Sequence, residues 1–173
     1  MTINRTDPHT TAPSVANPYA GRPFEPVDST VVHASITEEP LEPLLAGAKE
    51  ATMTRAMGAL VVFDGIVRDH DHGQPVAALA YSAHPQASDY LERALHSVAE
   101  EIPGVRLWAA HRIGPIPIGE SALTVLAAAA HRGTAFTACS LAADRIKAQV
   151  PIWKEQELTD GSVQWVGIDT PTG

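Results

Sequence analysis

Two lysines, Lys147 and Lys154, stand seven residues apart in the stretch KAQVPIWKEQ. A proline and a tryptophan, Pro151 and Trp153, lie between them. Because proline ends a helix, the chain can reverse here and bring both ammonium groups toward one pocket. Lysines crowded among cations and partly removed from water are suited to proton transfer or covalent chemistry. The alternative is that both are solvated surface residues, and the stretch alone favours this second interpretation.

The dipeptide His131-Arg132 is a second candidate, because it lies where an apolar strand is expected to end and a helix to begin. The first turn of a helix presents unpaired N–H groups that favour anions. A guanidinium at that point adds a bidentate grip for phosphate or carboxylate. Arg68, at the end of the strand-like run FDGIVRD, is a further cation of this kind. Equally, Arg132 can pair with a surface acid, and Arg68 can be a strand-end charge that reaches water.

Three other features favour ordinary structural roles. The run DHDH (69–72) offers four potential metal ligands in a row. A turn rarely directs consecutive side chains to one ion, so we expect a solvated polar turn and no metal site. Cys139 lies on the apolar stripe of a helix, where cysteine is commonly a small hydrophobic residue rather than a nucleophile. The dipeptide His111-Arg112 is interpreted as structural or as part of an interface.

The composition limits what these cations can bind. The formal net charge is −8, which argues against a general nucleic-acid surface or docking on an anionic membrane. The single cysteine excludes an internal disulfide, and no apolar run approaches the length of a membrane span. The first residues lack the pattern of a secretory signal. We therefore expect a soluble cytoplasmic protein in which any cation cluster is local.

The elements that would position these residues alternate along the chain. Residues 1–30 hold five of the 14 prolines and few large apolar residues, which predicts a disordered tail before one domain over residues 31–173. Apolar and β-branched runs predict strands at 31–36, 57–69, 76–84, 105–113, 121–130, 152–158 and 162–168. Strands 57–69 and 76–84 are expected to pair as a hairpin, and the last two strands as another.

Three stretches predict helices, at 37–51, 85–103 and 133–150. Thr37 and Thr134 are the candidate N-caps of the first and third. The third helix carries an apolar stripe that consists of Phe136, Cys139, Ala143, Ile146 and Val150. Helices that alternate with strand pairs and recurring hairpins indicate an α+β domain rather than a strict βαβ succession.

The quoted motifs resemble a known family. GALVVFDGIVRDHDHG, HRIGPIPIGE, AAAAHRGTAFTACSLAADRIKAQVPIWKEQ and the closing QWV are similar in order and spacing to the large, catalytic subunit of molybdopterin synthase. The similarity covers roughly residues 31–168. The elements A-H-R, K-x-x-x-P-x-W-K and G-x-V-R form a specific signature together, although each alone would be weak.

The resemblance implies a fold and an activity. The fold would be an α/β hammerhead-type domain with an additional antiparallel sheet. The chain would form a homodimer at the centre of a heterotetramer, with a small ubiquitin-like sulfur carrier at each end. The thiocarboxylated C-terminus of that carrier would give its sulfur to cyclic pyranopterin monophosphate and build the dithiolene of molybdopterin. The sulfurtransferase would need no cofactor, since the carrier supplies the sulfur.

The resemblance also implies roles for individual residues. Lys147 and Lys154 would be catalytic, with Lys147 nearest the terminal glycine of the carrier and with their two chemical roles open to exchange. The substrate-binding residues would be Ile66, Val67, Arg68, His131, Arg132, Glu155 and Gln156. In this set His131 and Arg132 would hold the phosphate, within one chain or across the dimer interface.

The chain departs from the family pattern at two places. Family members often have a basic or amide-rich run after the Trp-Lys pair, where this chain has Glu155 and Gln156. Some members carry an arginine after the closing tryptophan, where this chain has only VGIDTPTG after Trp165. The alternative function is that of a non-catalytic paralogue that binds the carrier or the partner subunit and regulates the pathway.

Overall fold

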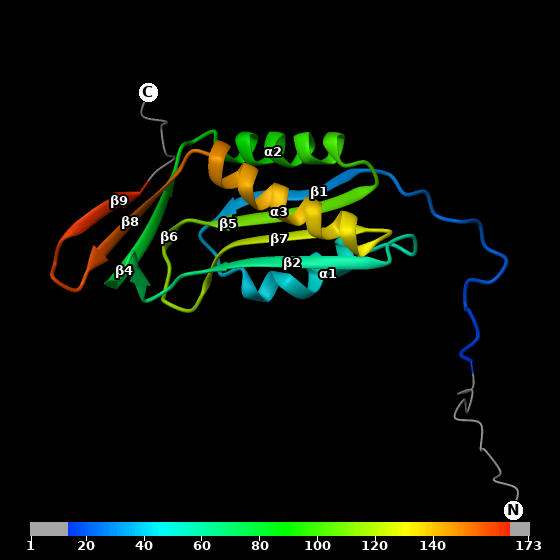
Figure 1. Ribbon diagram of the computed structural model, residues 1–173, viewed down its shortest axis with the longest axis horizontal. Coiled ribbons are helices and arrows are strands. Elements are labelled where there is room, and N and C mark those ends of the chain that lie inside the picture. Colours follow the sequence, from blue (N-terminus) through cyan, green and yellow to red (C-terminus); the bar gives the residue numbers. More distant parts are fainter. Residues whose placement is uncertain (1–13, 167–173) are drawn as a thin grey trace, which may run out of the picture.

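The computed structural model describes residues 14–166, which form two sheets side by side (Figure 1). The first sheet has the strand order β1-β5-β7-β2. Strand β1 pairs in parallel with β5, and the other two pairings are antiparallel. Its strands are β1 (Thr30–Thr37), β2 (Ala59–Ile66), β5 (Val105–Arg112) and β7 (Ser121–Ala129).

Helices cover both faces of this first sheet. Helices α2 (Ala87–Glu101) and α3 (Arg132–Gln149) pack on one face, where their apolar residues meet those of the strands in the main core. The short η1 (Glu42–Leu44) and α1 (Leu45–Thr52) lie on the other face, around Trp108 and Leu126. Because both faces are covered, every residue of β7 is buried. This matches the sequence prediction of a central strand at 121–130.

The second sheet is smaller and less covered. It runs β3-β4-β8-β9, and β6 also pairs with β4. Its buried cluster consists of six residues: Val67, Val76, Leu79, Ile116, Ala122 and Leu158. The strands are β3 (His70–Asp71), β4 (Gln74–Ala83), β6 (Gly114–Pro115), β8 (Ile152–Leu158) and β9 (Val163–Val166). All four residues of β9 are exposed, so this sheet lies at the rim of the molecule.

The α+β class and the closing hairpin of β8 and β9 are confirmed. The expected hairpin between the second and third predicted strands forms only at its turn, where β3 pairs with β4. The longer pairing is wrong, since β2 pairs with β7 and β4 pairs with β8. The register of β2 shifts between Gly65 and Ile66, and the chain then crosses to the second sheet. Because β7 is fully buried and apolar, β2 buries more surface against β7 than it could against β4. This gain outweighs the advantage of the short connection between β2 and β4.

Two helix starts differ from the sequence prediction. The Thr37 hydroxyl accepts the N–H of Glu39 in a turn, and the first α-helix begins only at Leu45. The third helix begins at Arg132 with His131 as N-cap, so Thr134 lies inside it. Phe136 is 62% exposed, because small residues such as Ala135 and Ala138 form the buried face instead. The prediction that Phe136 points inward is therefore wrong.

The N-terminal segment runs away from the two sheets (Figure 1). Residues 1–13 of the expected tail lie outside the described residues, and residues 14–29 contain no helix or strand. Close to the domain, Glu25 accepts the N–H of Arg55 at 2.7 Å, and the Ser29 hydroxyl accepts that of Gly104 at 2.8 Å. Disorder of the tail stays a prediction.

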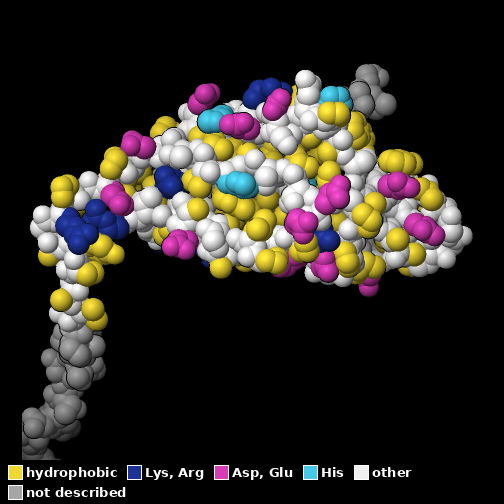
Figure 2. Space-filling view, turned by 180° about the vertical axis from the view of Figure 1, so that it is seen from behind, with side chains coloured by type: hydrophobic (Ala, Val, Ile, Leu, Met, Phe, Trp, Pro, Cys, Tyr) yellow, Lys and Arg dark blue, Asp and Glu magenta, His cyan; other side chains and the backbone are white. Residues whose placement is uncertain are grey.

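The surface agrees with the acidic composition. Figure 2 shows Asp and Glu side chains scattered among apolar ones, while Lys and Arg side chains mostly stand apart from one another. Among the helices within residues 14–166, none is both long enough and apolar enough to cross a membrane.

Candidate active site

A cavity of about 760 Å³ lies where α3 ends and the two sheets meet. Its walls come from β2, β5 and β7 of the first sheet, from β3, β4, β8 and β9 of the second, and from the last turns of α3. Six of the residues predicted from the sequence line it: Ile66, Val67, Arg68, Lys147, Lys154 and Gln156. The structure therefore brings both lysines and one arginine to a single cavity.

The reversal at Pro151 brings the lysines together. Helix α3 ends at Gln149, the N–H of its C-cap Val150 donates to the Ile146 carbonyl, and Pro151 cannot continue the helix. The Pro151 carbonyl accepts the N–H of His84 at 3.0 Å, which fixes the start of β8 beside β4. Lys147 in the last turn of α3 and Lys154 on β8 thus border the same space.

Lys154 is held by a carboxylate from the second sheet. Its Nζ donates to Asp71 Oδ2 at 2.5 Å, and the two side chains are only 20% and 11% exposed. This hydrogen bond is the main reason why the pKa of Asp71 lies below its usual range, with a smaller contribution from the charge of Lys154. Asp71 is therefore ionised at neutral pH.

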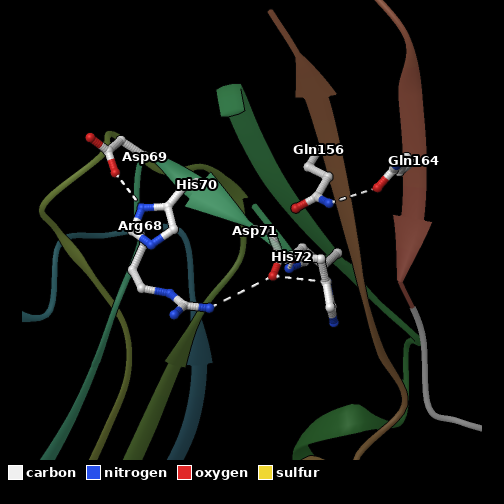
Figure 3. A network of polar contacts seen from close by, with 8 residues as sticks. Arg68, Asp69, His70, Asp71, His72, Gln156 and Gln164 are labelled. Carbon is white, nitrogen blue, oxygen red and sulfur yellow. Dashed lines mark hydrogen bonds and ion pairs between the residues drawn. The ribbon is translucent and has the colours of Figure 1, made fainter. Parts of the chain in front are cut away.

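The other oxygen of Asp71 faces an arginine and a histidine. Asp71 Oδ1 lies 3.7 Å from an Arg68 guanidinium nitrogen and 3.2 Å from His72 Nδ1 (Figure 3). The Arg68 side chain is 66% exposed, so its guanidinium remains accessible to a ligand. Arg68, Asp71 and Lys154 thus form one charged cluster on the wall of the cavity.

Lys147 is more open than Lys154. Its side chain is exposed, and within residues 14–166 it forms no ion pair or hydrogen bond. It also borders a second cavity of about 290 Å³ between α3 and β2, whose wall includes Val62 and Phe136. One lysine is thus fixed inside the site, and the other stands at its mouth.

His131 and Arg132 lie at the opposite end of α3. Fifteen residues separate Arg132 from Lys147, which corresponds to about 22 Å along a helix. Both side chains are exposed, and the helix start has no side-chain cap, so its first N–H groups face outward. Neither residue borders the cavity of its own chain.

Glu155 also stays outside the cavity. Side chains alternate along a strand, so Lys154 and Gln156 face the cavity and Glu155 faces away. Gln156 is 1% exposed, and its Nε2 donates to Gln164 Oε1 at 3.0 Å (Figure 3). Its Oε1 is buried and has no hydrogen-bond partner within residues 14–166, which leaves an acceptor in the wall of the site.

The cavity residues that the sequence interpretation missed include Asp71, Tyr81 and His111. The His111 ring meets Tyr81 edge to face at 5.2 Å, and its Nδ1 donates to the Arg112 carbonyl at 2.8 Å. Burial lowers the pKa of His111 to about 4, so the imidazole is neutral at pH 7. Burial also raises the pKa of Tyr81. Asp71 could have been found only by considering DHDH as a source of ion pairs as well as of metal ligands.

The remaining candidates for chemistry are the DHDH run, as a metal site, and Cys139, as a nucleophile. Within residues 14–166, no group of three or more His, Cys, Asp or Glu side chains is placed to hold a metal ion. Cys139 is buried against β7, and burial raises the pKa of its thiol to about 11. A thiol of this kind is unreactive, as expected for a structural cysteine.

The family model described as MoaE protein matches residues 36–149. The chain belongs to the MoaE family. Two curated MoaE relatives are similar over most of its length. The molybdopterin synthase catalytic subunit of Aspergillus fumigatus is 34% identical over 138 residues, which cover 78% of this chain and 71% of the relative. The molybdopterin synthase catalytic subunit 1 of Mycobacterium tuberculosis is 36% identical over 141 residues, which cover 78% of this chain and 90% of the relative.

Solved MoaE structures share the fold. Molybdopterin synthase from Staphylococcus aureus superposes with a TM-score of 0.72 at 34% identity, over 78% of this chain and 96% of that one. A complex of subunits 1 and 2 of the molybdopterin-converting factor from Helicobacter pylori gives a TM-score of 0.61 at 23% identity, over 82% and 92% of the chains. The resemblance found in the sequence motifs and the predicted fold class are both confirmed.

Proposed function

We propose that this chain is the catalytic subunit of a molybdopterin synthase. It transfers sulfur from the thiocarboxylated C-terminus of a small ubiquitin-like carrier to cyclic pyranopterin monophosphate, which forms the dithiolene of molybdopterin. The observation that carries this proposal is that both lysines of K-x-x-x-P-x-W-K border one cavity beside Arg68. Its relatives are named catalytic subunits, which supports a separate partner subunit as the sulfur carrier.

The charges of the cavity suit this chemistry. The carrier terminus and the substrate phosphate are both anions, and bringing them together in a partly dry site requires fixed cations. Lys147, exposed at the mouth, would neutralise the thiocarboxylate and the tetrahedral species formed as its sulfur leaves. Lys154, held inside by Asp71, would serve as general acid and base while the cyclic phosphate opens. Arg68, Ile66, Val67 and Gln156 would contact the substrate.

The proposal includes a homodimer that completes the site. Strand β2 is an edge strand with no partner on its outer side within residues 14–166, and Phe136 and Val62 beside it are 62% and 37% exposed. A twofold axis across this face would run the two α3 helices in opposite directions. The partner subunit's His131 and the partner subunit's Arg132 would then approach Lys147 and supply the grip for the phosphate.

The carrier would supply the sulfur, so the reaction would need no resident cofactor. The cytoplasm suits a thiocarboxylate and a chain whose one cysteine is a free thiol. Glu155, which faces away from the cavity, would contribute only through its neighbours on β8.

The test is Lys147→Ala, assayed with thiocarboxylated carrier by mass spectrometry of the pterin product. We expect turnover to fall by about 10²-fold or more, with unchanged folding and carrier binding. Lys49→Ala on α1 is the matched control, because it removes an exposed helical lysine far from the cavity, and it should turn over like the wild type.

Near-normal turnover by the Lys147→Ala chain would contradict the assignment of this residue. A wild-type chain that binds the carrier and yields no dithiolene would instead establish the non-catalytic paralogue.

A further inference from the structure

The β3–β4 turn supplies a charged residue that the proposed reaction does not use directly. We infer that Asp71 is a positioning residue, which acts through Lys154 by fixing the ammonium group against the wall of the cavity. This inference rests on the proposed function, because it assigns Asp71 a part in the same reaction.

A tight hairpin fixes the backbone of Asp71. Asp71 pairs with Gln74 across a two-residue turn, in which His72 and Gly73 have φ angles of 46° and 78°. Two consecutive residues with positive φ are typical of the turn that matches the twist of a hairpin. Strand β4 continues from this turn and pairs with β8, the strand of Lys154. The two members of the ion pair are thus attached to one sheet.

The ion pair restricts a side chain that is otherwise flexible. A lysine ammonium sits on a four-carbon stem and occupies many positions in water. Here Lys154 Nζ lies 2.5 Å from Asp71 Oδ2, and the two side chains are only 20% and 11% exposed. Water therefore competes weakly for this contact. A general acid must stand within hydrogen-bond reach of its target, and this restriction provides that geometry.

Asp71 also sets the spacing between two cations. Its Oδ2 takes the Lys154 ammonium, while its Oδ1 faces Arg68 at 3.7 Å and His72 at 3.2 Å. Without the carboxylate, the ammonium and the guanidinium would repel each other in a partly dry site. The one carboxylate keeps both cations on the same wall of the cavity.

A competing interpretation makes different predictions. Asp71 would be an occluding anion if its main effect were to fill the place of a substrate phosphate. Removing its charge would then lower KM and leave kcat unchanged or raised. A positioning residue instead affects kcat, because the substrate still binds to the remaining cations while proton transfer loses its geometry.

The experiment compares Asp71→Asn and Asp71→Glu with the wild type, using thiocarboxylated carrier and the pterin substrate. We expect Asp71→Asn to lower kcat by about 10-fold to 100-fold with little change in KM. Asp71→Glu keeps the charge and moves the carboxylate by one methylene, so it should retain more of kcat. Asp69→Asn is the matched control: within residues 14–166 the Asp69 carboxylate pairs only with His70, and its variant should turn over like the wild type.

A Lys154→Ala background separates positioning from a merely structural role. If Asp71 acts through Lys154, then Asp71→Asn lowers kcat no further in the chain that already lacks the lysine. A structural role would reduce kcat equally in both backgrounds and lower the Tm of both. If Asp71→Asn does not fold, Asp71→Glu carries the comparison through its kcat and its effect in the Lys154→Ala background.

The outcomes distinguish this inference from the function on which it rests. An active wild type together with an Asp71→Asn variant of normal kcat overturns the inference alone, and so does a variant with lower KM and unchanged kcat. A wild type that makes no dithiolene under the same conditions overturns the proposed function, and this inference with it.

Discussion

The two sheets of the molecule differ in how they are covered. The four-stranded sheet lies between α2 and α3 on one face and α1 on the other, and Val125 and Leu126 of its β7 are fully buried. The five-stranded sheet has only a six-residue buried cluster, and its outer strand β9 is exposed throughout. The first sheet holds most of the core, while the second lies at the rim (Figure 1).

The charged cluster belongs to the less covered sheet. Asp71 and Lys154 come from β3 and β8, and Arg68 from the connection that enters this sheet. Full burial of such charges would cost several kcal/mol for each ion, which partial exposure to water avoids. The difference between the sheets therefore separates the part that stabilises the fold from the part that holds the proposed reacting groups.

The largest expected effect tests the first sheet. Leu126→Ala removes a fully buried side chain of β7 and should lower the free energy of unfolding by about 2–5 kcal/mol. Val163→Ala on β9, where the side chain is 53% exposed, should change it by at most about 0.5 kcal/mol. Denaturant unfolding of both variants measures the contrast. Equal losses would show that the two sheets share the stability evenly.

The sequence predicts the strands of the first sheet better than it predicts their pairing. The apolar run at 121–130 identifies β7 because a strand covered on both faces needs no polar residues, and Pro151 marks the end of α3. The β2–β4 pairing was predicted wrongly because a short connection favours a local partner. The actual partner β7 is distant in sequence, and only the packed sheet shows how much more surface it buries with β2.

The site could be predicted in part. The stretch around Pro151 allows Lys147 and Lys154 to converge but by itself favours two solvated lysines, and only the family resemblance made them the catalytic candidates. The structure brings both to one cavity. Asp71 could not be identified as their neighbour, because nothing local shows that its turn faces β8. The separation of 15 positions between Arg132 and Lys147 already places them at opposite ends of one helix. In the proposed homodimer, the second copy of the chain would bring these groups together.

A smaller effect concerns the boundary between the sheets, where His111 is buried. Its pKa is lowered from the ordinary 6.5 to about 4, because burial disfavours the charged ring. In the unfolded chain the imidazole of His111 therefore takes up a proton below about pH 6.5, while in the folded chain the ring stays neutral until about pH 4. The contribution of the neutral, buried His111 to the free energy of unfolding is fully present above pH 6.5. It is lost as pH falls toward 4, by roughly 3 kcal/mol at most.

The measurement is the free energy of unfolding of His111→Gln and wild type across this pH range. The variant should be less stable at neutral pH but should lose less stability on acidification. His96→Gln, at an exposed position on α2, is the matched control and should follow the wild-type profile. Parallel profiles for His111→Gln and the wild type would contradict the proposed burial effect.

The smallest expected effect is a partial return of turnover, which tests whether the two ends of α3 serve different sites of a dimer. Lys147→Ala and Arg132→Ala chains should each be inactive alone if each site takes its lysines from one chain and its Arg132 from the other. Mixing them by refolding together gives half mixed dimers, each with one complete site and one that lacks both groups. We expect roughly a quarter of wild-type turnover to return.

The matched control for this experiment mixes Lys147→Ala with Lys154→Ala. Both lysines border the cavity of a single chain, so every site in these dimers lacks one of them, and turnover should stay at the low residual level of the single variants. Recovery in the first mixture and not in the second would assign the two ends of α3 to different sites. Absence of recovery in both would place Arg132 in the site of its own chain, against the length of the helix. Recovery in both would show that the two lysines themselves act in different sites, which would contradict the cavity as the catalytic unit.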